Sequence, residues 1–227
     1  MTTNIKSKQL GILLNEFELI SKTALTQIQL VNKIMQDYTL AESLYDDVKT
    51  NEMIIDRLEI KIREEVVFSI FQFNPIAAEL RMIIAYLEIA TNLERVGDML
   101  LNVTQYVKET DLSDNKLHGL RNKMGKMLTY AHEMLRDAIL SFSNQDAATA
   151  YKVINFDDKV DELFHQIKLS LQEIYSNKEN SANDIKTLIN IESIAHNIER
   201  VGDSATNIAE AAIYLAEGKD IRHGNKE

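Results

Sequence analysis

The chain has 227 residues, of which 45% are hydrophobic, and its formal net charge of −10 makes it acidic. Nucleic-acid affinity depends on clustered Lys and Arg, so direct binding to DNA or RNA is not expected. The absence of cysteine excludes disulfides, thiolate metal sites and cysteine nucleophiles, and leaves oxygen and histidine as metal ligands. One proline and seven glycines predict few, long helices.

The amino-terminal half shows three helical segments. Apolar residues recur at three- and four-residue spacing between Leu10 and Met35, which predicts a first amphipathic helix. A second helix is expected over residues 40–73. A third is expected from the Asn-Pro dipeptide at 74–75 to about residue 108, because asparagine is a favoured N-cap and proline is tolerated at the first helical position.

The carboxyl-terminal half repeats this pattern after a polar connector at 110–115, in which Ser113 or Asp114 is available as a helix cap. An apolar stripe runs over residues 117–142, and a last helix is expected from Ser181 to the residue before Gly218. The sequence therefore predicts an all-α protein. We expect two tandem, similar three-helix bundles, with six long antiparallel helices in all. The first bundle would occupy residues 1–110 and the second residues 111–227.

An exact internal repeat supports this duplication. The pentapeptide ERVGD at 94–98 recurs unchanged at 199–203, an offset of 105 positions (199 minus 94). Over residues 89–102, nine of fourteen positions match their partners at 194–207, whereas identity is thin elsewhere. The repeated segments are therefore the expected location of the chemistry.

Each half carries two acidic pairs, and the members of a pair are four residues apart. The pairs are Glu52 with Asp56 and Glu94 with Asp98 in the first half, and Asp157 with Asp161 and Glu199 with Asp203 in the second. Residues four apart lie on one face of a helix. Carboxylates that converge from two packed helices raise each other's pKa, and a bound cation would relieve that conflict. The pattern predicts one metal site per half.

Glycine inside a helix costs about 1 kcal/mol relative to alanine. Its recurrence at Gly97 and Gly202 indicates that a neighbouring backbone approaches closely where the acids lie. The sites are expected in grooves between helices, near the bundle surface. Oxygen ligands select hard cations such as magnesium, manganese or ferric iron, and zinc remains open.

A solvated acidic face with salt bridges to Arg57, Arg95 and Arg200 is the alternative, but four pairs in register favour metal. His196 lies one turn before Glu199 and could ligate a metal; because its counterpart is Thr91, packing is the favoured interpretation. The asparagines at 92, 102, 197 and 207 are favoured as ordinary polar residues at helix edges over supports for the metal ligands.

A single Glu-x-x-His motif occurs at 162–165, whereas oxygen-activating di-iron bundles use two such motifs. An enzyme of that kind is therefore disfavoured. The sequence also shows no Ser/His/Asp set and no glycine-rich phosphate loop.

The segments NPIAAELR at 74–81 and NLERVGD at 92–98, with weaker copies at 182–186 and 197–203, resemble the signature of the PhoU family. Members of this family are phosphate-signalling regulators that accompany bacterial phosphate transporters. The resemblance covers essentially the whole chain. It implies two similar three-helix bundles whose E(D)xxxD motifs bind iron or zinc clusters, which assigns the four acids of each half to one cluster.

The resemblance also implies a role without catalysis. The expected partners are the ATPase subunit of a phosphate ABC transporter and a phosphate-sensing histidine kinase, between which the protein would act as a cytoplasmic adaptor and negative regulator. No membrane span is expected, only peripheral association through the transporter, and a homodimer is left open. The alternatives are a carboxylate-cluster metalloenzyme such as a phosphohydrolase, and an accessory regulator of an ion-driven phosphate transporter.

Overall fold

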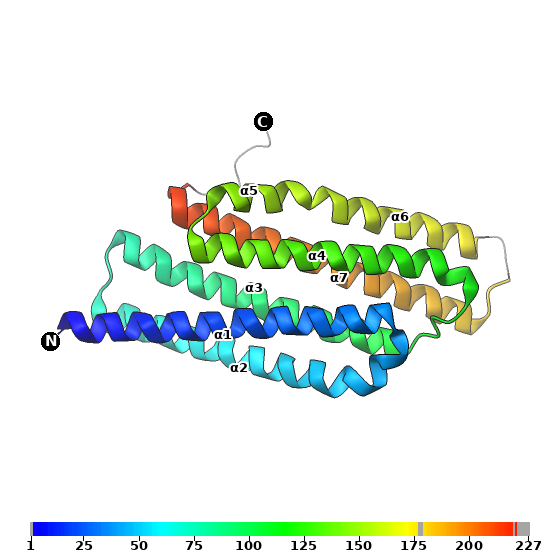
Figure 1. The fold of residues 1–227 in the computed structure, drawn as a ribbon, viewed down its shortest axis with the longest axis horizontal. Coiled ribbons are helices and arrows are strands. Elements are labelled where there is room, and N and C mark those ends of the chain that lie inside the picture. The colour runs from blue at the N-terminus through cyan, green and yellow to red at the C-terminus, as the bar shows by residue number, and fades with distance from the viewer. Residues whose placement is uncertain (1, 177–178, 220, 222–227) are drawn as a thin grey trace.

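The computed structural model describes residues 2–176, 179–219 and 221. Within these residues, seven α-helices form two stacked layers of long rods, with α1 to α3 in one layer and α4 to α7 in the other (Figure 1). They are α1 (Thr2–Gln36), α2 (Ala41–Phe73), α3 (Ala77–Lys108), α4 (His118–Asn144), α5 (Ala147–Phe156), α6 (Asp158–Tyr175) and α7 (Ala182–Glu217). Two short 3-10 helices, η1 (Tyr38–Leu40) and η2 (Asn115–Leu117), precede α2 and α4. The predicted all-α pair of tandem bundles is confirmed.

The middle helix of the second bundle is interrupted at Asp157, where α5 ends and α6 begins. The two pieces follow one line and together take the place that α2 has in the first bundle (Figure 1). The N–H of Asp157 donates to the carbonyl oxygen of Ile154 at 3.4 Å, a bond to the third residue back instead of the fourth. This tighter turn of the backbone explains why the expected single helix is divided at an acidic residue of the predicted site.

The predicted start of the third helix at Asn74-Pro75 was wrong by two to three residues. Asn74 has φ 43°, in the left-handed region, and its N–H donates to the carbonyl oxygen of Ile70, so it ends α2. Asparagine tolerates this conformation and is therefore a helix C-cap as well as an N-cap. The helix α3 begins after the extended residue Ile76, whose N–H donates to the carboxylate of Glu79 at 3.4 Å.

The predicted caps of the second half are confirmed. The N–H of Asp184 donates to the hydroxyl of Ser181 at 3.2 Å, and the N–H of Ser181 donates to the Asp184 carboxylate at 3.2 Å. Asp114 accepts a bond from the N–H of Lys116 at the start of η2. Gly218 ends α7 with φ 71°, a conformation that glycine adopts without strain.

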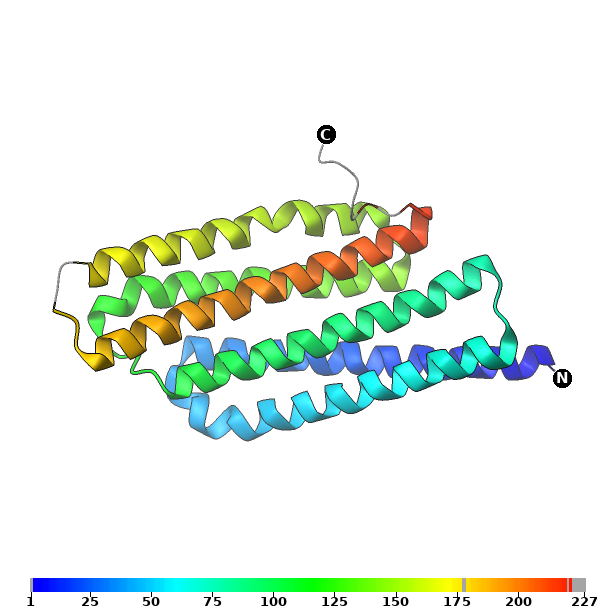
Figure 2. The ribbon, with the colours of Figure 1, turned by 180° about the vertical axis from the view of Figure 1, so that it is seen from behind.

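The two bundles share one hydrophobic core. The helices α3 and α7 lie side by side through the middle of the molecule (Figure 2), and α1 packs against α4. The rings of Phe17, Tyr86 and Phe142, from α1, α3 and α4, lie with centroids 5.1 to 5.3 Å apart. Burial of each such side chain stabilises the fold by about 1.5 to 3 kcal/mol. The bundles are thus joined by the same forces that hold each one together.

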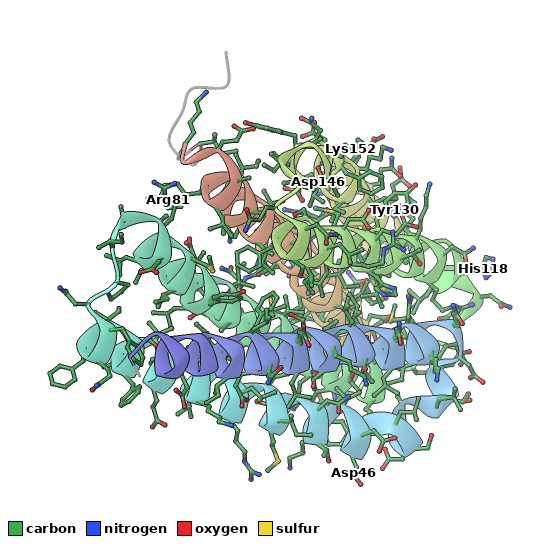
Figure 3. All side chains as sticks on the ribbon, turned by 60° about the vertical axis from the view of Figure 1, so that its left-hand side comes forward. Asp46, Arg81, His118, Tyr130, Asp146 and Lys152 are labelled. Atoms are coloured by element: carbon green, nitrogen blue, oxygen red, sulfur yellow. The ribbon has the colours of Figure 1, made fainter. Side chains whose placement is uncertain are left out.

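Polar contacts also cross the boundary between the bundles. The side-chain amide of Asn207 on α7 donates to that of Asn92 on α3 at 3.3 Å. Arg81 extends from α3 toward the end of α7 (Figure 3), where its guanidinium carbon lies 5.1 Å from the ring centroid of Tyr214. A Cβ added to Gly218 would lie 2.8 Å from Nη1 of Arg81, so the glycine also leaves room for this contact. Two of the predicted helix-edge residues, Asn92 and Asn207, therefore join the bundles.

Candidate metal centre

The first acidic group, which we call the first cluster, comprises Glu52 and Asp56 on α2 and Glu94 and Asp98 on α3. One carboxylate oxygen from each of Glu52, Asp56 and Asp98 lies within 4.8 Å of the other two. Glu94 is not among these three, but its charge contributes to the raised pKa of Glu52. Two helices thus bring at least three carboxylates together. The separation between their oxygen atoms is one that a shared cation can bridge.

Packing between the helices places these acids. Ile55 and Leu93 are fully buried, and they directly precede Asp56 and Glu94 in the chain. A Cβ added to Gly97 would lie 3.2 Å from Cδ1 of Ile55. The close approach expected at this glycine is therefore made by a side chain and not by a neighbouring backbone. Because Ile55 seats against Gly97, the residues that follow each of them, Asp56 and Asp98, face the same groove.

The electrostatics of the first cluster oppose full ionisation. Burial, followed by the charge of Asp56, raises the pKa of Glu52 to about 7. Burial and then neighbouring carboxylates also raise the pKa values of Glu94 and Asp98. Neighbouring carboxyl groups whose pKa values are raised oppose one another's ionisation, and a bound cation removes that opposition. The donor set and its electrostatics therefore fit a hard cation.

The second cluster comprises Asp157 between α5 and α6, Asp161 on α6, and Glu199 and Asp203 on α7. The charge of Asp161 contributes to the raised pKa values of Asp157, Glu199 and Asp203, so the four acids lie near one another. Burial is the largest cause at each of these three, and it raises the pKa of Asp157 to about 6. Among the described residues, however, only the first cluster brings three ligand oxygens within 4.8 Å. The ligand atoms of the second cluster, the His196 nitrogens included, are therefore less tightly gathered than those of the first.

Gly202 makes room for a carboxylate of the second cluster. A Cβ added at this position would lie 3.2 Å from Oδ1 of Asp157 and 3.4 Å from Cγ1 of Val160. This Asp157 oxygen is buried and accepts no hydrogen bond of normal geometry, and the nearby hydroxyl of Thr206 offsets only part of the rise in the Asp157 pKa. A buried carboxylate oxygen without a partner is costly, and coordination to a cation would satisfy it.

Basic residues partly neutralise both clusters. The positive charge of Arg95 lowers the pKa of Glu94, and that of Arg200 lowers the pKa of Asp203, although burial and carboxylate neighbours outweigh both effects.

The Glu-x-x-His motif at 162–165 has a contact outside the second cluster. The Glu162 carboxylate accepts a hydrogen bond from Nε2 of Gln166 on the same helix at 3.0 Å.

Sequence reasoning missed one acid beside the first cluster. Glu59 on α2 has only 8% of its surface exposed, accepts a bond from the Thr91 hydroxyl at 3.2 Å and pairs with Arg63. Its charge contributes to the raised pKa of Glu94. The signal was its position three residues after Asp56, which places it on the same face of α2.

The fold and the clusters define a class: an all-α protein of two tandem three-helix bundles, each with carboxylates between its second and third helical rods. The PhoU domain model matches residues 17–107 and 124–212, one match in each bundle. This chain belongs to the PhoU family. Within the described residues, none of the helices combines the length and apolarity needed to cross a membrane.

Named relatives agree with this assignment. The chain is 31% identical over 187 residues to phosphate-specific transport system accessory protein PhoU homolog 1 of Thermotoga maritima, covering 81% of this chain and 78% of the relative. It is 35% identical over 183 residues to a PhoU homolog of Burkholderia sp, covering 79% and 76%. The crystal structure of PhoU from Pseudomonas aeruginosa has a TM-score of 0.83 at 25% identity, covering 94% of this chain and 99% of that one. PhoU of Streptococcus pneumoniae shares the fold, with a TM-score of 0.74 at 20% identity.

Proposed function

We propose that this protein is a metal-binding, non-catalytic regulator of phosphate uptake and of phosphate-starvation signalling. Its relatives are named as accessory proteins of the phosphate-specific transport system, which supports the link to phosphate. The observation that carries the metal-binding part is the convergence of Glu52, Asp56 and Asp98 from two helices.

The residues of each cluster fit a role in holding metal ions. Glu52 and Asp56 would bind from one helix and Glu94 and Asp98 from the next, with the equivalent four acids acting in the second bundle. By family resemblance the ions are iron or zinc, and oxygen ligation also suits magnesium or manganese. A bound cation supplies the positive charge that lets these carboxylates ionise together.

The regulatory role is that of an adaptor. The protein would contact the ATPase subunit of a phosphate ABC transporter and the phosphate-sensing histidine kinase in the cytoplasm, and act as a negative regulator when phosphate is plentiful. Long helical faces that lie side by side, such as those of the antiparallel α1 and α2, offer extended surfaces for such contacts (Figure 1).

The experiment compares binding with turnover. Purified chain, with iron, zinc or manganese present, is tested for capture of the purified transporter ATPase subunit and for release of phosphate from p-nitrophenyl phosphate. We expect capture of the subunit and no ester hydrolysis above buffer. Hydrolysis that disappears in Asp98→Asn would replace the proposal with a metallophosphohydrolase. Capture of an ion-driven phosphate transporter in place of the ATPase subunit would reassign the partner.

A further inference from the structure

The two clusters differ at one pair of equivalent positions. The offset of 105 that relates the acids also relates positions 59 and 91 to positions 164 and 196. In the first bundle these are Glu59 and Thr91, joined by the 3.2 Å hydrogen bond. In the second they are Phe164 and His196, whose rings stack with centroids 5.9 Å apart and an interplanar angle of 25°. A carboxylate and a hydroxyl in one bundle are therefore replaced by a phenyl ring and an imidazole in the other.

The imidazole is directed at the second cluster. His196 lies on α7 one turn before Glu199, and its Nδ1 is 3.3 Å from Oε2 of Glu199. Its positive charge, when present, lowers the pKa values of both Glu199 and Asp203, which places it near both carboxylates. Half of its side chain is exposed, at 51%, and its ring stacks on Phe164, so the packing that the sequence favoured involves only part of the side chain.

The separation of these two atoms suits two ligands of one ion. A tetrahedral ion with bonds of about 2.0 to 2.1 Å to nitrogen and oxygen places those two atoms about 3.4 Å apart. Stacking on Phe164 fixes the plane of the imidazole, so the nitrogen is held in place before a metal arrives. A hydrogen bond from Nδ1 to Glu199 has a similar length in the absence of metal, so the same contact orients the imidazole in both states.

We propose that His196 is a nitrogen ligand of the second cluster, beside Glu199, and that the two clusters of this chain select different metals. This inference rests on the proposed metal-binding function. The first cluster has only oxygen donors, with the carboxylate of Glu59, which pairs with Arg63, close by. Such an oxygen-only set favours hard ions such as Mn²⁺ or Fe³⁺. The second cluster exchanges that carboxylate for an aromatic ring and adds an imidazole, which favours borderline ions such as Zn²⁺.

The test measures Zn²⁺ and Mn²⁺ binding to metal-free full-length chain in which the first cluster is blocked by Glu94→Ala and Asp98→Ala. In this background His196→Thr installs the residue of the first bundle. We expect the Zn²⁺ affinity to fall tenfold or more, by about the factor that loss of a supporting metal contact causes, while the Mn²⁺ affinity changes less than about twofold. The ¹⁵N shift of the His196 ring, assigned by its loss in His196→Thr, should move when Zn²⁺ is added.

A reciprocal variant supplies the matched control. Glu59→Phe with Thr91→His, made in chain whose second cluster is blocked by Glu199→Ala and Asp203→Ala, should raise the Zn²⁺ preference of the first cluster. If His196→Thr leaves Zn²⁺ affinity unchanged, and Zn²⁺ does not move the ring shift in the chain that keeps His196 while metal still binds, the inference is wrong and the proposed metal-binding function stands. If the unsubstituted chain binds neither ion, both fall.

Discussion

The side-chain amide of Gln27 on α1 donates from Nε2 to the main-chain oxygen of Gly97 on α3, with an N···O distance of 2.8 Å. Gln27 is fully buried, and Gly97 lies inside the repeated pentapeptide between Glu94 and Asp98. The first helix of the bundle thus holds the segment that carries one acidic pair, although it contributes no acid itself.

Replacement of Gln27 by methionine tests the energetics of this contact. The apolar stripes of the first helices of the two bundles are related by an offset of 107 positions, so the equivalent residue of the second bundle is Met134 (27 plus 107). Its Cε would lie 3.8 Å from a Cβ at Gly202. Oε1 of Gln27 is buried without a partner, a cost of about 1 to 3 kcal/mol that exceeds the gain of about 0.5 to 1.5 kcal/mol from the hydrogen bond. We therefore expect Gln27→Met to raise the free energy of unfolding in urea by about 1 kcal/mol.

Gln27→Ala is the control for this prediction. It removes the same hydrogen bond but leaves a cavity, and should lower the free energy of unfolding by about 2 kcal/mol or more. A Gln27→Met protein that is less stable than the parent by more than about 1 kcal/mol would show that the hydrogen bond outweighs the unsatisfied oxygen.

The two repeated glycines should respond differently to alanine. At Gly97 the added Cβ meets the flexible end of Ile55, whereas at Gly202 it meets the carboxylate of Asp157, each at 3.2 Å. Alanine also gains about 1 kcal/mol of helix propensity at either position. We expect Gly97→Ala to weaken metal binding only slightly, because the end of Ile55 can shift, and Gly202→Ala to weaken binding at the second cluster more strongly by displacing the ligand Asp157 itself. Titration calorimetry measures both; equal losses would contradict the difference in packing.

The stability of the metal-free chain should fall as the pH rises. The pKa of Glu52 is about 7 in the folded chain against an ordinary value of 4.5, and that of Asp157 is about 6 against 3.8. Between the ordinary and the raised pKa of each group, the folded state binds more protons than the unfolded state. The free energy of unfolding therefore decreases with increasing pH in this range. Urea unfolding between about pH 5 and pH 8 measures the slope.

Glu52→Gln separates the first cluster from the rest of the chain in that experiment. It should make the slope shallower without abolishing it, because Asp157 still titrates. Metal affinity should rise with increasing pH, since protons compete with the cation for the carboxylates. An unaltered slope in Glu52→Gln would show that the Glu52 carboxyl group is not perturbed in the folded chain.

Much of the fold was predictable because long helices are strongly periodic. The stripe from Leu10 to Met35 and the Ser181 cap each depend on local sequence, and both were read correctly. The Asn74-Pro75 turn was misplaced because asparagine suits both ends of a helix, and only the chain path decides between them. The break at Asp157 has only a weak local signal, the acidic residues Asp158 and Asp161 in the first turn of α6.

The candidate site was predictable only in part. The four-residue spacing placed the two acids of each pair on one face of a helix. The internal repeat then related the acidic pairs of the first half to those of the second. Which acids converge depends on how Ile55 seats against Gly97 and how Asp157 seats against Gly202, and these are tertiary contacts. Glu59 was not predicted because its equivalent in the second half is Phe164. The comparison of the two halves identified only acids that occur in both.

Elemental analysis of protein purified without added metal tests the central claim, that the acidic clusters hold metal ions, most directly. A matched control is Asp46→Ala with Asp47→Ala, which removes the same charge from exposed positions on α2 (Figure 3). We expect bound metal in the parent and in this control. Metal content should fall to about half when Glu94 and Asp98 become alanine, because these substitutions remove carboxylate ligands from one of the two clusters. Parent protein without bound metal, or unchanged content in the Glu94/Asp98 variant, would contradict the account.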